Sequence, residues 1–255
     1  MNWIDAVVLG IVEGITEFLP VSSTGHLILT AKFLHLSQTD FLKSFEIAIQ
    51  LGAILAVVVL YGRSLFTNFS ILKKVAAAFI PTAVIGLVLY KIIKKFLLGD
   101  FHVVLWSMFL GGIFLIVFEF FYQGSRASTD KIEKISYSNA VLIGIFQSLA
   151  VVPGVSRSAA TILGGLILGV ERKTIVEFSF LLAVPTMLAA TALDLLKSAG
   201  AFSVDQFGFL AVGFAVSFAV ALLSIKFLLY FIKRNNFVGF GIYRIAAAIL
   251  FWFLI

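Results

Sequence analysis

The chain has 255 residues, of which 61% are hydrophobic and only 13% are charged, and its formal net charge is +6. Soluble domains carry about 25% charged residues, so this composition excludes an ordinary soluble protein. Because the sequence contains no cysteine, it also excludes disulfide bonds, thiolate metal sites and cysteine nucleophiles.

The first half of the chain predicts two short apolar helices followed by three long ones. The short segments cover about residues 3–18 and 23–36, with Pro20-Val21-Ser22-Ser23 between them. The first segment lacks the basic start and the cleavage site of a signal peptide, so we expect it to be retained. Three long segments, each close to the roughly 20 residues that span a bilayer, lie near residues 43–62, 72–96 and 102–122.

The second half repeats this order after a polar connector at residues 123–136. Short segments near 137–152 and 157–169 are separated by Pro153-Gly154-Val155-Ser156. Long segments follow near residues 174–196, 206–232 and 238–255. Residues matched at offsets of 133 to 135 indicate a duplication, and the matches are Gly10-Ile11 with Gly144-Ile145, Glu13 with Gln147, Pro20 with Pro153, Ser23 with Ser156, and Ser44-Phe45 with Ser179-Phe180.

The predicted fold is therefore an all-α polytopic membrane protein. We expect a single membrane domain over residues 1–255, with a first repeat at 1–122 and a second at 137–255. If each short pair is a re-entrant helix-loop-helix, each repeat adds three transmembrane helices. This odd number makes the arrangement an inverted repeat, as in many transporters.

Positive charges predict which side of the membrane each loop faces. The positive-inside rule places the more basic loops in the cytoplasm, which directs both termini outward. Basic residues at the ends of apolar segments also favour contact with membrane lipids over binding of nucleic acid. The more basic set of loops holds Arg63, Lys73, Lys74, Arg126, Lys131, Lys134, Arg172, Lys173, Lys233 and Arg234, and five lysines lie on the opposite side.

Two carboxylates in the first apolar segment indicate a ligand. Glu13 and Glu17 are four residues apart, so a helix places them on one face. Carboxylates within a membrane are costly unless they are paired, hydrated or liganded, and oxygen ligands suit a divalent cation such as Mg²⁺ or Ca²⁺. The alternative is a surface helix whose acidic face lies in water.

The first break, Pro20 to His26, has the composition of a phosphate-binding turn. Ser or Thr side chains can cap the following helix, and the free N–H groups at its start offer an anion site. We predict that Ser22, Thr24 and Gly25 bind substrate and that Ser23 and His26 are catalytic. The other two histidines, His35 and His102, lie near segment ends and are more typical of solvated side chains.

The second break adds an arginine at the start of an apolar segment. The guanidinium of Arg157 suits a bidentate grip on phosphate, so we predict a catalytic role for it. The alternative is an arginine that snorkels at the membrane edge. The predicted substrate-binding residues of this break are Gly154, Ser156, Ser158 and Thr161.

The two breaks carry a resemblance to a known family. Glu13-Gly-Ile-Thr-Glu17-Phe-Leu-Pro-Val-Ser-Ser-Thr-Gly-His26 and Pro153-Gly-Val-Ser-Arg-Ser-Ala-Ala-Thr161 resemble the two signature regions of the undecaprenyl-pyrophosphate phosphatases of the bacitracin-resistance type. Chain length, segment order and Ser44-Phe-Glu-Ile-Ala-Ile-Gln50 extend the similarity over essentially the whole chain.

This resemblance implies hydrolysis of a polyprenyl diphosphate to its monophosphate and inorganic phosphate. The reaction would be metal-dependent and would take place at the outer, periplasmic side of the bacterial cytoplasmic membrane. We expect Arg157 and the N–H groups after Ser23 and Ser156 to bind the diphosphate, and Glu17 with Glu13 to hold the cation, which makes Glu17 a catalytic residue as well as a metal ligand. The nucleophile stays open between Ser23 with His26 as its base, His26 itself, and a metal-bound water.

Two other functions share parts of this pattern. The phosphatidic-acid-phosphatase type also carries Ser-Arg, but it needs a histidine where this chain has Leu163. A transporter or flippase of a phosphorylated polyprenyl lipid would explain the broken helices and Arg157. It would not require His26 beside paired carboxylates. A homodimer is also left open.

Overall fold

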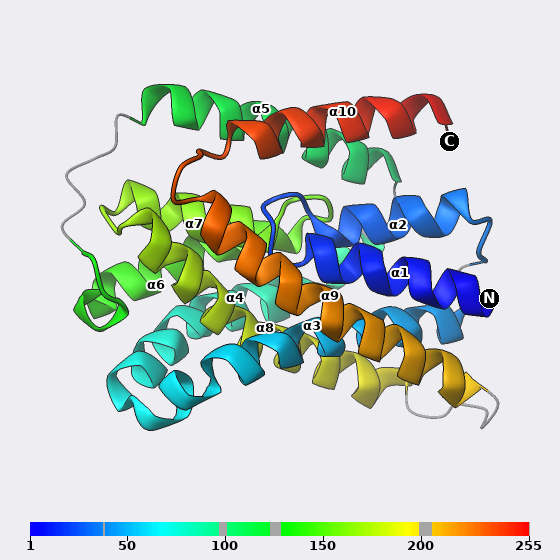
Figure 1. Cartoon of the computed structure of the whole chain (residues 1–255), viewed down its shortest axis with the longest axis horizontal. Coiled ribbons are helices and arrows are strands. Elements are labelled where there is room, and N and C mark those ends of the chain that lie inside the picture. The colour runs from blue at the N-terminus through cyan, green and yellow to red at the C-terminus, as the bar shows by residue number, and fades with distance from the viewer. Residues whose placement is uncertain (38, 97–100, 123–128, 199–205, 255) are drawn as a thin grey trace.

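The computed structural model describes residues 1–37, 39–96, 101–122, 129–198 and 206–254, so Arg126 and the first six residues of the predicted connector lie outside it. Within these residues the chain is helical and contains no strand beyond an isolated bridge between Thr129 and Val170. The all-α prediction is confirmed. The helices are α1 Trp3–Thr16, α2 Ser23–Phe33, α3 Asp40–Thr67, α4 Phe69–Phe96, α5 Phe101–Phe121, η1 Ile132–Lys134, α6 Tyr137–Ser148, η2 Leu149–Val151, α7 Arg157–Ile167, α8 Arg172–Ser198, α9 Phe207–Phe231 and α10 Val238–Leu254 (Figure 1).

Five of these helices are long and apolar enough to cross a membrane, which confirms a multi-pass membrane protein. They are α3, α4, α5, α8 and α9. The sixth predicted span corresponds to α10, which at 17 residues is the shortest of the six.

The short helices form two hairpins that enter the molecule from opposite ends. α1 starts at the end where both chain termini lie, turns near the middle, and returns to that end as α2 (Figure 1). α6 and α7 form the second hairpin from the other end (Figure 1). This is the arrangement expected of two opposed helix-loop-helix units, and their inversion relative to a bilayer stays a prediction.

Local sequence explains where the first hairpin bends. α1 begins with a reciprocal cap, in which the Asp5 N–H donates to the side chain of Asn2 and the Asn2 N–H donates to Asp5. It ends at Thr16, four residues before Pro20. α2 then begins after Ser22, whose φ of 75° reverses the chain direction.

Packing between the two halves supports the predicted duplication. α1 packs against α9 of the other half, and α6 correspondingly packs against α4. A side chain on Gly10 would overlap the carbonyl oxygen of Gly213, and one on its match Gly144 would overlap the carbonyl oxygen of Ala78. Ala78 and Gly213 are themselves 135 residues apart, so the same close approach occurs twice. Glycine is required there because the helix backbones touch.

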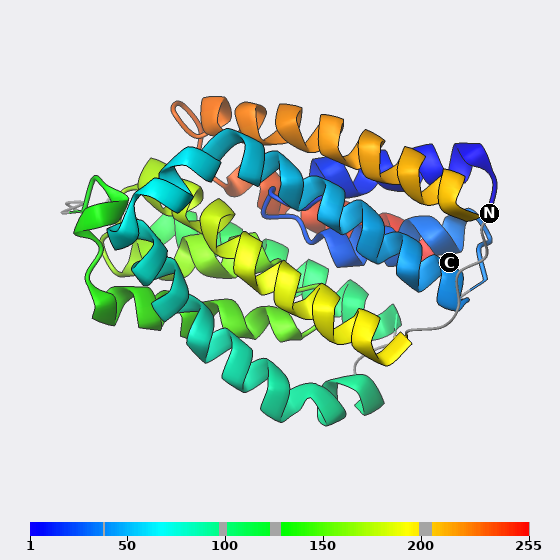
Figure 2. The same ribbon diagram turned by 90° about the horizontal axis from the view of Figure 1, so that it is seen from below.

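The remaining helices enclose the hairpins. α5 and α10 pair above them, and α3, α4 and α8 lie below, with α9 crossing α1 (Figure 1). Seen from below, α3, α8 and α4 run side by side (Figure 2). Phe18, in the turn after α1, packs edge-on against Phe180 of α8 with ring centroids 5.3 Å apart. This buried contact fixes the backbone next to Glu17.

Candidate active site

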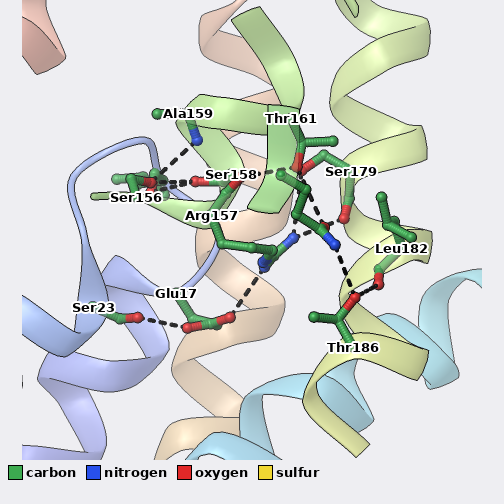
Figure 3. Close-up of polar contacts among 12 residues, drawn as sticks. Glu17, Ser23, Ser156, Arg157, Ser158, Ala159, Thr161, Ser179, Leu182 and Thr186 are labelled. Atoms are coloured by element: carbon green, nitrogen blue, oxygen red, sulfur yellow. Dashed lines mark hydrogen bonds and ion pairs between the residues drawn. The ribbon is translucent and has the colours of Figure 1, made fainter. Parts of the chain in front are cut away.

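The turns of the two hairpins are bonded to each other in the middle of the molecule. The Ser158 hydroxyl donates to the carbonyl oxygen of Leu19 at 2.8 Å, which joins the second break to the first. The Ser156 hydroxyl lies 2.9 Å from that of Ser158 and accepts from the N–H of Ala159 (Figure 3). Two regions predicted separately from sequence therefore form one site.

A buried ion pair between Arg157 and Glu17 crosses this junction. Nη2 of Arg157 lies 3.0 Å from Oε1 of Glu17, and their side chains are 10% and 2% exposed. Nη1 of Arg157 donates to the carbonyl oxygen of Ser179 on α8 at 2.8 Å (Figure 3). The guanidinium thus points into the protein, which contradicts the alternative of a snorkelling arginine.

Ser23 is bonded to the other oxygen of the same carboxylate. Its hydroxyl donates to Oε2 of Glu17 at 2.6 Å, within the range of charge-assisted O–H···O bonds (Figure 3). Glu17 therefore lies between a hydroxyl that can act as a nucleophile and a guanidinium that can bind phosphate. A carboxylate in this position can accept the hydroxyl proton, as a general base must.

The side chains of His26 and Ser23 are hydrogen-bonded to other residues and not to each other, which differs from the predicted pairing of the two residues. Its Nδ1 lies 2.8 Å from the carbonyl oxygen of Ser22, and its Nε2 lies 2.8 Å from the hydroxyl of Tyr243. Because a carbonyl can only accept, Nδ1 carries the proton, and in the neutral ring Nε2 accepts from Tyr243. Both ring nitrogens are occupied by partners other than the predicted nucleophile.

The other predicted substrate-binding residues of the first break have different surroundings. Ser22 caps α2, and its hydroxyl accepts from the N–H of Gly25 at 3.4 Å. Gly25 is buried, and a side chain there would overlap the sulfur of Met108. Thr24 is exposed. The first N–H groups of α2 have no partners within the helix, so they remain candidates for an anion site.

In the second break, Ser156 caps α7, while Thr161 and Gly154 make contacts with main-chain atoms. The Thr161 hydroxyl donates to the carbonyl oxygen of Arg157 at 2.9 Å and faces Gln147. Gly154 has a φ of +90°, which favours glycine, and packs against the carbonyl oxygen of Val104. These contacts hold the break in place.

Glu13, the second predicted cation ligand, is enclosed by the protein. Its side chain is fully buried, and neither carboxylate oxygen has a hydrogen-bond partner. A buried charge without a partner is costly, so this carboxylate requires a cation or a proton. Among the residues that the structure describes, no group of three or more His, Asp and Glu side chains is placed to hold a metal. Two carboxylates together with substrate phosphates are nevertheless a usual environment for Mg²⁺.

Sequence reasoning missed Tyr243 and Arg244, which lie next to each other on α10. Arg244 is 1% exposed, and its acceptors in the described part of the chain are all main-chain carbonyls. It donates to Pro20 of the first break, to Gly154 of the second, and to Ser107 and Met108 of α5. A lone arginine inside the last apolar segment was the available signal, because charged residues within a membrane segment are expensive.

Comparison with known proteins covers both breaks and α10. The family model described as bacitracin resistance protein BacA matches residues 6–250. The chain belongs to the BacA family. The resemblance predicted from the two breaks is thereby confirmed over nearly the whole chain.

Relatives in the BacA family are similar over nearly their full lengths. A protein of Aquifex aeolicus named undecaprenyl-diphosphatase is 53% identical over 246 residues, 96% of each chain. One of Persephonella marina with the same name is also 53% identical, over 98% of each chain. A third, from Bdellovibrio bacteriovorus, is 44% identical over all of this chain and 97% of its own.

Proposed function

We propose that the protein is an integral membrane phosphatase that hydrolyses undecaprenyl diphosphate to the monophosphate and inorganic phosphate. The observation that carries this proposal is the cluster of Ser23 and Arg157 around the buried carboxylate of Glu17, which joins a nucleophile, a base and a phosphate-binding guanidinium. The BacA relatives are named undecaprenyl-diphosphatase, and we infer the substrate from that name. In the cell, the reaction would recycle the lipid carrier of cell-wall synthesis.

In the proposed reaction, Ser23 attacks the terminal phosphorus of the diphosphate. Its proton passes to Glu17, to which it is already hydrogen-bonded. The bond between the bridging oxygen and the terminal phosphorus breaks, and undecaprenyl monophosphate leaves. Glu17 gives the proton to the departing monophosphate. Water then attacks the phosphoserine and its proton passes to Glu17, which returns it to the Ser23 oxygen as inorganic phosphate leaves. His26, held by Tyr243, positions the start of α2.

Positioning and charge stabilisation would supply most of the catalysis, as in phosphoryl transfer generally. Nε of Arg157 is buried and has no partner, so it is available to a phosphate oxygen. The first N–H groups of α2 and α7 add donors at the same junction. Neither helix has an acidic residue in its first turn that would repel an anion.

We place a divalent cation, Mg²⁺ or Ca²⁺, at Glu13 and Glu17. The unpartnered oxygens of Glu13 support this placement. When bound, the cation would neutralise charge on the diphosphate and on the departing phosphate. Within the protein, the role of Glu13 would be to offer ligand oxygens without competing hydrogen bonds.

The test of this function is phosphate release from a polyprenyl diphosphate by the purified protein in detergent. We expect release in the presence of Mg²⁺ or Ca²⁺, its loss in EDTA, and its recovery when the cation is restored. Absence of release under all conditions would reject the phosphatase. Release that is unaffected by EDTA would exclude a role for the cation, and the roles proposed for Ser23, Glu17 and Arg157 would stand.

We also propose that the protein lies in the cytoplasmic membrane with its termini and the open end of the first hairpin facing outward. The absence of cysteine makes the test direct. A membrane-impermeant maleimide should label whole cells carrying Ser37→Cys, between α2 and α3, but not cells carrying Lys131→Cys, in the connector. Both positions are exposed. The reverse labelling pattern would invert the proposed orientation.

A transporter or flippase is the less favoured function. Carrying a phosphorylated lipid requires the phosphate-binding groups, but it gives no role to the Ser23 hydroxyl bonded to Glu17. A homodimer stays a prediction.

A further inference from the structure

A cleft lies between α5 and α7, on the side of α7 that faces α5 and α10. α5 packs mainly against α10 and only slightly against α2 (Figure 1). The space beside it, between α5, α6 and α7, has a volume of about 130 Å³. Its walls are almost entirely apolar, and the small residues Gly111, Ala159 and Ala160 leave the room.

The two ends of this cleft differ in character. Ser156 and Arg244 line the inner end and are 3% and 1% exposed. Phe114, Leu149 and Ile167 line the outer end and are 56%, 60% and 53% exposed. In a membrane protein, the outer end therefore opens to hydrocarbon. Ser156, at the inner end, caps α7. The start of α7 belongs to the candidate active site.

We propose that this cleft binds the first isoprene unit of the polyprenyl chain, which deepens the proposed function and rests on it. A diphosphate at the start of α7 leaves its attached carbon chain beside Ser156, where the cleft begins. A cavity of roughly 150 Å³ holds a six-carbon ring in another protein, so about 130 Å³ suits one five-carbon unit. The rest of the chain would pass between α5 and α7 into lipid, past Phe114 and Ile167.

The choice of an isoprenoid follows from the wall chemistry. Apart from Ser156 and Arg244, the lining offers no side-chain donor or acceptor. The Arg244 guanidinium is already bonded to four carbonyls, so it does not offer a second anion site. A ligand there gains chiefly from the burial of apolar surface.

Filling the cleft tests the proposal. Ala160→Phe should raise KM for farnesyl diphosphate by about 10- to 100-fold, the amount expected from losing burial of one leucine-sized group, with little change in kcat. Ala160→Leu should give a smaller increase. The matched control is Ala246→Phe, which places the same ring on the exposed face of α10 and should keep the wild-type KM.

A second measurement requires no variant. A farnesyl diphosphate with a photoreactive diazirine in its first isoprene unit should label peptides of α5, α6 or α7 that line the cleft in the wild-type protein. A separate apolar pocket lies between α5 and α10 and is lined by Trp106, Phe109 and Trp252. Labelling confined to that pocket, or equal KM values for Ala160→Phe and Ala246→Phe, would overturn the proposal. Failure of the wild type to release phosphate would instead reject the proposed function, and the labelling pattern would still decide the cleft.

Discussion

Arg157→Lys is expected to reach normal levels in the membrane and yet lose most phosphate release. Lysine keeps a positive charge beside Glu17, but it cannot reach Glu17, Ser179 and a phosphate with one planar set of donors. Losing a preorganised donor to a developing charge costs about 2–4 kcal/mol, which corresponds to about a 30- to 1,000-fold decrease in kcat/KM. Arg157→Ala should retain less activity than Arg157→Lys, and it should also be less stable because it leaves Glu17 buried without its cation.

The matched control for this substitution is Arg172→Lys. Arg172 also pairs with a buried carboxylate, Glu119, but it lies at the start of α8, away from both breaks. We expect Arg172→Lys to lower thermal stability and to leave turnover per folded molecule close to that of the wild type. Near-wild-type turnover in Arg157→Lys would mean that Arg157 has a structural role only, and the site would lose its phosphate-binding side chain.

Glu17→Gln is expected to abolish most activity, because glutamine can neither accept the proton of Ser23 nor balance the charge of Arg157. Loss of a general base costs about 100- to 10,000-fold in rate. If Ser23 and Glu17 act as one unit, Ser23→Ala should cost a similar factor. The double variant should then be scarcely worse than either single variant, because residues that act together give non-additive losses.

The measurement is single-turnover phosphate release by the wild type, both single variants and the double variant. Glu119→Gln serves as the control, since it removes a buried carboxylate paired with Arg172 but not with the breaks. Multiplicative losses in the double variant would show that Ser23 and Glu17 act independently. Full activity in Glu17→Gln with an unchanged response to cations would remove the carboxylate from the mechanism.

The fold could be predicted from sequence because the apolar segments of a membrane protein are recognisable by their length and composition. Apolar length located the spans, and Pro20 and Pro153 located the turns of both hairpins. The site's central residues were also predictable, since a buried carboxylate, a hydroxyl and an arginine within apolar segments each require a partner.

The partners themselves could not be predicted. Ser23 and His26 are close in sequence, which made them an apparent pair, but Ser23 bonds to Glu17 six residues earlier and His26 bonds to Tyr243, 217 residues later. Such distant contacts depend on how α10 packs over α5, which local patterns do not encode. The snorkelling alternative for Arg157 was wrong because of another distant contact. The guanidinium donates to the carbonyl oxygen of Ser179 on α8.

Arg244 has a consequence for when the site is completed during synthesis. Both breaks, with every predicted catalytic residue, leave the ribosome before position 244 is translated. Until then, the carbonyls of Pro20 and Gly154 lack the side chain that bonds to both of them. The turns can therefore enter the membrane one after the other, joined to each other by the Ser158–Leu19 hydrogen bond and the Arg157–Glu17 ion pair, and the Arg244 bonds are added when the final helix is made. A chain released before α10 would carry both breaks but would lack the four hydrogen bonds by which Arg244 ties them to α5.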